Sequence, residues 1–161
     1  MSEQEPIEYT KEEVDKAYEE ALDDVHTRFI LNLPPEELAS TNRIFFQLEQ
    51  AWWFYDDFIC DGSDKPLPRF KGVKPFALKL FQTSPVLSPL LPQFPKYWEE
   101  FSKYKRTIST YGTILMNQDC TKVILCQVWN GKTWMFPAGK INQNEDGCMQ
   151  VSHKQKILVW I

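Results

Sequence analysis

The sequence lacks any long apolar run. No part of its 161 residues approaches the roughly 18 consecutive apolar residues that a membrane-spanning helix needs. Its first residues, MSEQEPIEYTKEE, are acidic, whereas a secretion signal begins basic and then becomes apolar. We therefore expect no association with a membrane and a location in the cytoplasm or the nucleus.

Paired cysteines are also missing. The chain has Cys60, Cys120, Cys126 and Cys148, and no two of them form a C-x-x-C pair. This spacing argues against a zinc site and, without a secretion signal, against a disulfide framework. Histidine is scarce as well: His153 has only the distant His26 as a second candidate ligand, so it is a poor metal ligand. No internal repeat or low-complexity segment is visible.

What is present favours a folded chain with two different parts. Hydrophobic residues make up 43% and aromatic residues 14%, which is enough for a packed core. Residues 1–100 carry 10 Lys and Arg against 19 Asp and Glu, a balance of −9. Residues 101–161 carry 8 against 3, a balance of +5. This asymmetry indicates two modules, of which the basic one would meet a polyanionic ligand, unless the acidic part is only a solvated helix face.

Helical periodicity dominates the first hundred residues. Thr10 and Glu13 form a capping-box pattern, and apolar residues at helical spacing predict a helix that ends near Asn32. The same signals predict further segments in chain order: a helical turn at 34–37, a helix over 40–59, a loop over 60–70, and helices over 73–85 and 95–106.

The period changes near residues 105–110. From there the residues predict a strand, a turn at 117–119, a β-branched strand over 122–129 and a second turn at 130–131. We therefore expect a helical domain that is followed by a β domain.

Two motifs resemble one family. LDDVHTRFILNLPPEEL and RIFFQLEQAWWFYDDFI closely resemble the helical regulatory domain of the catalytic subunit of the mRNA-decapping enzyme. FSKYKRTISTYGTILMN and WMFPAGKI resemble the hinge and the opening of that enzyme's Nudix domain. The resemblance runs from about residue 22 to about residue 150.

The resemblance implies a function. That family hydrolyses the 7-methylguanosine cap of mRNA, releases 7-methyl-GDP and acts in mRNA decay, in cytoplasmic P-bodies. Its helical domain binds an activator subunit and contacts the cap base through residues that correspond to Trp53 and Asp57. An indole can stack on the cationic base, and a carboxylate can accept from its N–H groups. The alternative is that Trp52 and Trp53 are both core residues.

The Nudix signature, G-x5-E-x7-R-E-U-x-E-E-x-G-U, gathers carboxylates for Mn²⁺ or Mg²⁺. Gly139, whose backbone would approach the metal in a complete domain, and Glu145 match its first part. Lys154, Ile157 and Leu158 stand where the signature requires glutamates. We therefore predict that the chain as written binds no such metal and is inactive as a hydrolase.

The signature fails directly after Gln150, where Gln-Val-Ser can be encoded by the CAG-GTAAGT of a common exon–intron junction. We hypothesise that residues 151–161 are a non-native tail that is translated from intron. A smaller departure is Ala138, because decapping members usually carry Lys there; Lys140 is then the better candidate for a phosphate or RNA contact.

The expected class is α+β, with an all-helical regulatory domain followed by the first strands of an incomplete Nudix domain. We assign residues 1–20 to an acidic extension and helix start, 21–106 to the helical domain and 107–161 to the truncated Nudix domain. Two functions stay open: an incomplete decapping hydrolase, or a short isoform that binds the activator subunit and capped mRNA without turnover. A helical interaction domain unrelated to caps is a third.

Overall fold

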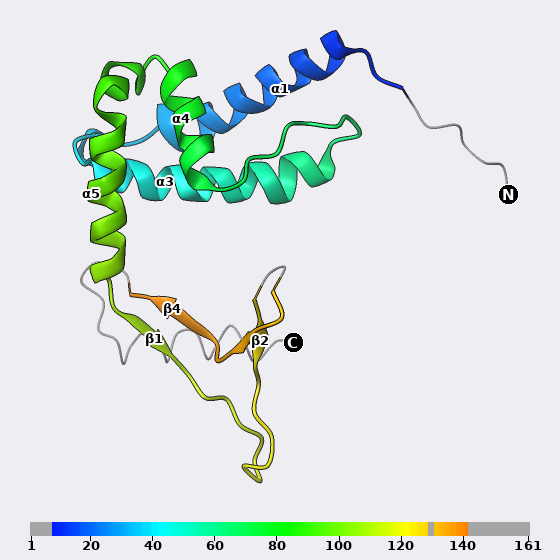
Figure 1. Ribbon diagram of the computed structural model, residues 1–161, viewed down its shortest axis with the longest axis vertical. Helices are drawn as coiled ribbons and strands as arrows, with labels where there is room; N and C mark the ends of the chain where they lie inside the picture. Colours follow the sequence, from blue (N-terminus) through cyan, green and yellow to red (C-terminus); the bar gives the residue numbers. More distant parts are fainter. Residues whose placement is uncertain (1–7, 129–130, 142–161) are drawn as a thin grey trace, which may run out of the picture. The chain divides into compact units, whose positions relative to one another are not determined.

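The structure is a computed structural model that describes residues 8–128 and 131–141, and Figure 1 shows its elements. The chain divides into two compact units, Met1–Lys103 and Tyr104–Ile161. The described part of the first unit is helical, and that of the second contains short antiparallel strands joined by irregular segments. This confirms the α+β class with an N-terminal helical part.

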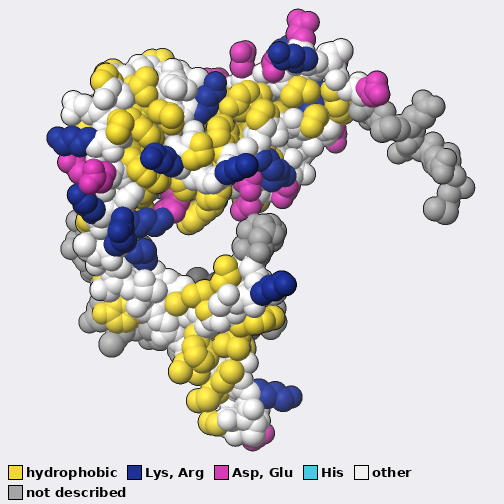
Figure 2. Space-filling model, viewed as in Figure 1, with side chains coloured by type: hydrophobic (Ala, Val, Ile, Leu, Met, Phe, Trp, Pro, Cys, Tyr) yellow, Lys and Arg dark blue, Asp and Glu magenta, His cyan; other side chains and the backbone are white. Residues whose placement is uncertain are grey.

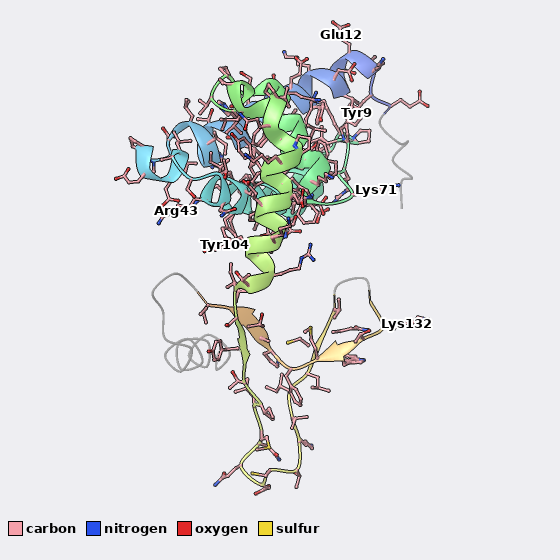
Figure 3. All side chains as sticks on the ribbon, turned by 60° about the vertical axis from the view of Figure 1, so that its left-hand side comes forward. Tyr9, Glu12, Arg43, Lys71, Tyr104 and Lys132 are labelled. Carbon is pink, nitrogen blue, oxygen red and sulfur yellow. The ribbon has the colours of Figure 1, made fainter. Side chains whose placement is uncertain are left out.

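The first helix, α1 (Lys11–His26), begins at the predicted capping box. The Thr10 backbone N–H donates to Glu13 Oε2 at 2.8 Å, and the Glu13 N–H donates to Thr10 Oγ1 at 3.3 Å. Glu12, labelled in Figure 3, lies in the same first turn, where negative charge is favourable against the helix dipole. The opposite face of α1 buries Ala21, Leu22 and Val25.

Two long helices change their winding near their ends. The π-helical segment η1 (Thr27–Leu31) continues α1, and the Asn32 side-chain amide closes it by donating to the Thr27 carbonyl at 3.0 Å. In the same way, the π-helical segment η2 (Tyr55–Cys60) continues α3 (Thr41–Phe54). The sequence predicts both helical spans but not the π-helical turns.

Short connections join the remaining helices. Between η1 and α3 lies α2 (Pro35–Leu38), whose Glu37 pairs with Arg43 of α3, a residue labelled in Figure 3. The loop that follows η2 leads to α4 (Val73–Thr83), the 3₁₀ segment η3 (Ser88–Gln93) and α5 (Phe94–Thr107). The sequence predicts α2, α4 and α5 within one or two residues, but it does not predict η3.

Phe45 lies at the centre of the core of the first unit. It is fully buried, and its ring centroid lies within 5.8 Å of four others. These rings belong to α4 and α5: Phe81, Phe94, Trp98 and Phe101. Burial of large aromatic surfaces in tilted and stacked pairs is a strong source of packing energy. The four rings therefore hold α3, α4 and α5 together.

The second unit holds two pairs of strands. β1 (Thr110–Gly112) pairs antiparallel with β4 (Ala138–Lys140), and β2 (Cys126–Gln127) pairs with β3 (Trp134–Met135). The predicted turn after Met116 is present, because the Asn117 side-chain oxygen accepts from two backbone N–H groups at 2.8 Å each.

The predicted strand over 122–129 is wrong in its extent. Among residues 122–128, which the structure describes, only the bridge of Val123 to Met116 and the short β2 are regular. A ribbon of two strands is marginal without further strands, and this accounts for the short ladders. None of the described residues of this unit is buried, and Figure 2 shows apolar side chains gathered on its surface.

Within the described residues, no helix is long and apolar enough to cross a membrane. Cys60 is a buried free thiol, and Cys120 and Cys126 are exposed free thiols. Cys148 lies outside the described residues.

Candidate functional site

Trp53 and Asp57 are both exposed on the first unit. Trp53 lies in the last turn of α3 and is 45% exposed, and Asp57 lies in η2. Residues four apart in a helix share one face. The two side chains are therefore available together to a ligand from solvent.

Trp52 differs from its neighbour. It is half-buried and packs against the core, and its indole N–H has no hydrogen-bond partner within the described chain. The alternative that both tryptophans are core residues is wrong for Trp53. The helical period separates the two residues, because one step along a helix turns the side chain away from the core.

Tyr55 anchors the helix turn between Trp53 and Asp57. It is fully buried, and its hydroxyl donates to the Pro68 carbonyl at 2.8 Å. Burial, together with the neighbouring Cys60 thiol, raises the pKa of Tyr55 well above its ordinary value. Tyr55 therefore stays a neutral hydrogen-bond donor that ties η2 to the loop after it.

Arg69 binds two of the three aspartates near this turn. Its guanidinium donates to Asp56 at 3.0 Å and also to Asp61. The hydrogen bond to Asp61, followed by the Asp61 and Asp56 charges, raises the pKa of Arg69. Across residues 8–128 and 131–141, Asp57 forms no ion pair. The carboxylate of Asp57 is therefore available to accept hydrogen bonds from a ligand.

A shallow hollow of about 570 Å³ also lies in the first unit. Its lining is mixed, with a Lys65 ammonium 5.6 Å from the Tyr9 ring centroid. The full lining is Tyr9, Cys60, Ser63, Asp64, Lys65, Pro66, Leu67 and Arg69. Burial raises the pKa of the Cys60 thiol, so this sulfur is a weak nucleophile at neutral pH.

Gly139 and Lys140 lie in β4 of the second unit. Gly139 pairs with Tyr111 of β1. The Lys140 ammonium donates to the Lys105 carbonyl and, at 3.2 Å, to the Ile108 carbonyl. Lys140 thus binds the C-terminal end of α5, a contact that the sequence does not predict. Trp53 and Asp57 belong to the first unit, whereas Gly139 and Lys140 belong to the second.

The remaining signature positions lie outside the described residues. These are Glu145, Lys154, Ile157 and Leu158. Residues 8–128 and 131–141 contain no group of three or more His, Cys, Asp or Glu side chains that could hold a metal ion. Lys, Ile and Leu side chains do not provide the oxygen ligands of Mg²⁺ or Mn²⁺. Neither the described residues nor the side chains at 154, 157 and 158 therefore fit such an ion.

The sequence did not predict a set of packed side chains on η1, α3 and η2. Phe54 contacts the tilted ring of Phe29, with centroids 5.5 Å apart, and the stacked ring of Phe58, with centroids 5.4 Å apart. The Arg28 guanidinium lies 5.5 Å from the centroid of the Phe54 ring. The spacing of Phe54 and Phe58, four residues apart, was the signal that could have revealed this set.

Comparisons with known proteins agree on one family. The family model described as "Dcp2, box A domain" matches residues 20–104. The mRNA decapping complex subunit 2 of Schizosaccharomyces pombe is 39% identical over 129 residues, 80% of this chain and 17% of its own length. The mRNA-decapping enzyme subunit 2 of Arabidopsis thaliana is 32% identical over 127 residues, 79% of this chain and 34% of its own length.

A third relative is the m7GpppN-mRNA hydrolase of Saccharomyces cerevisiae. It is 34% identical over 141 residues, 88% of this chain and 14% of its own length. The chain therefore spans between about a seventh and a third of the length of these curated relatives.

Proposed function

The chain belongs to the Dcp2 family of mRNA-decapping subunits through its box A domain, and from this premise we propose that its helical unit contacts the 7-methylguanosine cap of mRNA. The observation that carries the proposal is the joint exposure of Trp53 and Asp57 on one helix face. Trp52, by contrast, packs against the core.

The chemistry of the two side chains suits a cap base. The 7-methylated guanine is cationic, and the face of an indole attracts a cation. A carboxylate accepts hydrogen bonds from the N–H groups on the edge of guanine, and a charged acceptor makes these bonds stronger. Tyr55 and Arg69 support this arrangement, because Tyr55 fixes the helix turn and Arg69 neutralises the adjacent Asp56 rather than Asp57.

We further propose that the full-length protein takes part in hydrolysis of the cap, releasing 7-methyl-GDP. The name of the Saccharomyces cerevisiae relative, m7GpppN-mRNA hydrolase, supports this. For the 161 residues as they stand we propose binding without turnover, since Lys154, Ile157 and Leu158 occupy the glutamate positions of a Nudix signature.

A second function is a docking module for an activator subunit. The first unit has a complete aromatic core, which supports a stable binding domain. The name of the Schizosaccharomyces pombe relative, decapping complex subunit 2, implies companion subunits for that protein. A location in cytoplasmic P-bodies, or in the nucleus, remains a prediction.

Binding of 7-methyl-GDP tests the cap contact directly. We expect Trp53→Ala to weaken the affinity of the chain about five- to thirtyfold, since a cation stacked on an indole contributes roughly 1–2 kcal/mol. We expect Asp57→Asn to weaken it as well. Leu78→Ser is the matched control, because it removes an exposed apolar side chain from α4 instead. Equal affinities of wild type and Trp53→Ala, or equal binding of unmethylated GDP, would contradict the proposal.

Hydrolysis is tested separately. Capped RNA with a labelled cap is incubated with the chain and Mn²⁺, and release of 7-methyl-GDP is measured. We expect no release above the rate without protein. Release by the 161-residue chain would show that the residues at 154, 157 and 158 do not prevent turnover.

A further inference from the structure

An ordered column of side chains reaches the surface of the first unit. It consists of Arg28, Phe29, Phe54 and Phe58, which we call the aromatic column. The Phe54 and Phe58 rings are stacked, with 29° between their planes. Phe58 is the outermost ring and is 68% exposed, more than any other large apolar side chain in the described part of the chain.

The inner members of the column, Phe29 and Phe54, pack against the core, and Arg28 is paired beside them. Arg28 is held over the Phe54 ring by Asp24, whose two carboxylate oxygens accept from Arg28 Nε at 2.7 and 2.8 Å. Phe29 packs on the Phe54 ring and is itself partly buried against the core. A rigid aromatic group binds a partner at a low cost in conformational entropy.

Both π-helical segments contribute to the column. Arg28 and Phe29 belong to η1, and Phe58 belongs to η2. π-Helical turns are rare and are often found at functional sites. Two such segments contribute to one exposed aromatic group here. This is a second observation that indicates a binding site.

The charge around the column is negative. Six carboxylates and four basic groups lie on the last turn of α1, on the two π-helical segments and on the loop that follows η2, a balance of −2: Asp23, Asp24, Asp56, Asp57, Asp61 and Asp64 against Arg28, Lys65, Arg69 and Lys71. A single-stranded RNA could stack on Phe58, but its phosphates would be repelled, because such sites track the backbone with positive charge. A basic partner is favoured instead.

We propose that the aromatic column is a docking site for a segment of a partner protein that presents an aromatic or leucine side chain flanked by Lys or Arg. The apolar side chain continues the stack on Phe58, and the basic residues meet the surrounding aspartates. This goes beyond the proposed function and does not depend on it.

The test uses the full chain, labelled with ¹⁵N, and three probes. The first probe is a 12-residue peptide with one central Phe between pairs of Lys. The second is the same peptide with Glu in place of Lys, and the third is an uncapped decamer of uridine. Amide shifts identify the binding surface, and titration gives the affinity. Phe58→Ser is compared with Leu78→Ser, which removes an exposed apolar side chain from α4.

We expect the Lys peptide to shift the amides of residues 28, 54 and 58 and to bind more weakly as salt rises. The Glu peptide should bind at least about tenfold more weakly, and Phe58→Ser should weaken the Lys peptide by about tenfold, as for an interface hot spot. Leu78→Ser should bind as the wild type does. The affinity of Phe58→Ser for 7-methyl-GDP is measured as well. This second affinity distinguishes a loss of peptide binding at the aromatic column from a loss of the cap contact.

Three outcomes would overturn the proposal. The first is unchanged binding of the Lys peptide to Phe58→Ser, and the second is equal binding of the Lys and Glu peptides. The third is uridine binding that Phe58→Ser abolishes while the peptides fail to bind, which would assign the aromatic column to nucleic acid.

Discussion

Tyr55 connects the packing of the core to the two candidate cap contacts. Its ring packs against Phe70 and Phe76, with centroids 5.7 and 5.6 Å away, and its hydroxyl holds the Pro68 carbonyl. Since Tyr55 lies between Trp53 and Asp57 in sequence, any loosening of its ring would loosen both. The residue is thus a support for the site and not a part of it.

We predict that Tyr55→Phe lowers the free energy of unfolding by about 1 kcal/mol, because the Pro68 carbonyl loses its donor while the ring is kept. Urea titration at pH 7 measures this change. Tyr111→Phe is the control, since Tyr111 is 42% exposed. Equal losses in the two variants would contradict a special role of the Pro68 bond.

The pH dependence of the same variant follows from the raised pKa of Tyr55. The folded state keeps the phenolic proton at a pH at which the unfolded chain, with a pKa of about 10, releases it. Stability should therefore fall as the pH rises above about 10. Tyr55→Phe should show a shallower fall than the wild type.

For single residues, the sequence singled out Trp53 and Asp57 as candidate contacts but did not predict their environment. The motif around Trp53 was sufficient to single it out from Trp52, but its exposure depends on which helix face meets α4 and α5. The role of Phe45 was missed for the same reason, because its ring partners are contributed by Phe81, Phe94, Trp98 and Phe101.

Among the elements, α1 depends on its capping box. The hydrogen bonds from the Thr10 backbone and then from its side chain lower the pKa of Glu13. A lowered pKa means that this stabilisation is present above the ordinary value of about 4.5 and is lost as the pH falls through the value in the folded state.

We predict that Thr10→Ala destabilises the first unit by about 1 kcal/mol at pH 7. The difference from the wild type should shrink as the pH falls and Glu13 becomes protonated. Amide exchange in the first turn of α1 measures both effects. Glu13→Gln is the control, since Gln keeps an acceptor but does not titrate. A difference that is independent of pH would show that the Glu13 charge does not matter.

The end of α5 depends on Lys140. Its ammonium lies at the C-terminal end of this helix, where positive charge is favourable. We predict that Lys140→Met speeds amide exchange over residues 104–109 severalfold and that Lys140→Arg does so much less. If the exchange is unchanged while binding of 7-methyl-GDP weakens, Lys140 is a phosphate contact, as the sequence suggested.

Regular elements were predictable where local signals and packing agree. The capping box, the prolines and the apolar spacing locate α1, α2, α4 and α5. The π-helical turns were not predictable, because the extra residue in each turn is accommodated by neighbouring helices. Nor was η3, because prolines at 85, 89 and 92 also suit an irregular loop. Strand extent was overestimated because alternation does not tell how many neighbours a strand has.

In the whole molecule, the two units differ in how many side chains they bury. The described residues of the first unit form a continuous core of seventeen side chains with an aromatic centre. The described residues of the second unit include no buried side chain. Since stability comes mainly from burial, the two units should open with very different free energies.

We predict that trypsin cuts after Lys122 and Lys132 before it cuts within residues 8–103. Both lysines are exposed in the second unit, and Lys132 is labelled in Figure 3. Mass spectrometry of a digestion time course measures the order. Phe45→Ala should lower the free energy of unfolding of the first unit by about 3–5 kcal/mol. In this variant, cuts in the first unit should appear as early as the cuts after Lys122 and Lys132. Early cuts within residues 8–103 of the wild type would contradict the difference between the units.

The central position of Phe45 has a consequence for synthesis on the ribosome. Its ring partners come 36 to 56 residues later in the chain, from Phe81 to Phe101. At about 5–20 residues per second, the last of these partners emerges about 3 to 11 seconds after Phe45 does. During that interval the apolar face of α3 is only partly covered, first by η1 and then by α4. The nascent chain therefore exposes apolar surface that chaperones can bind until α5 has been made.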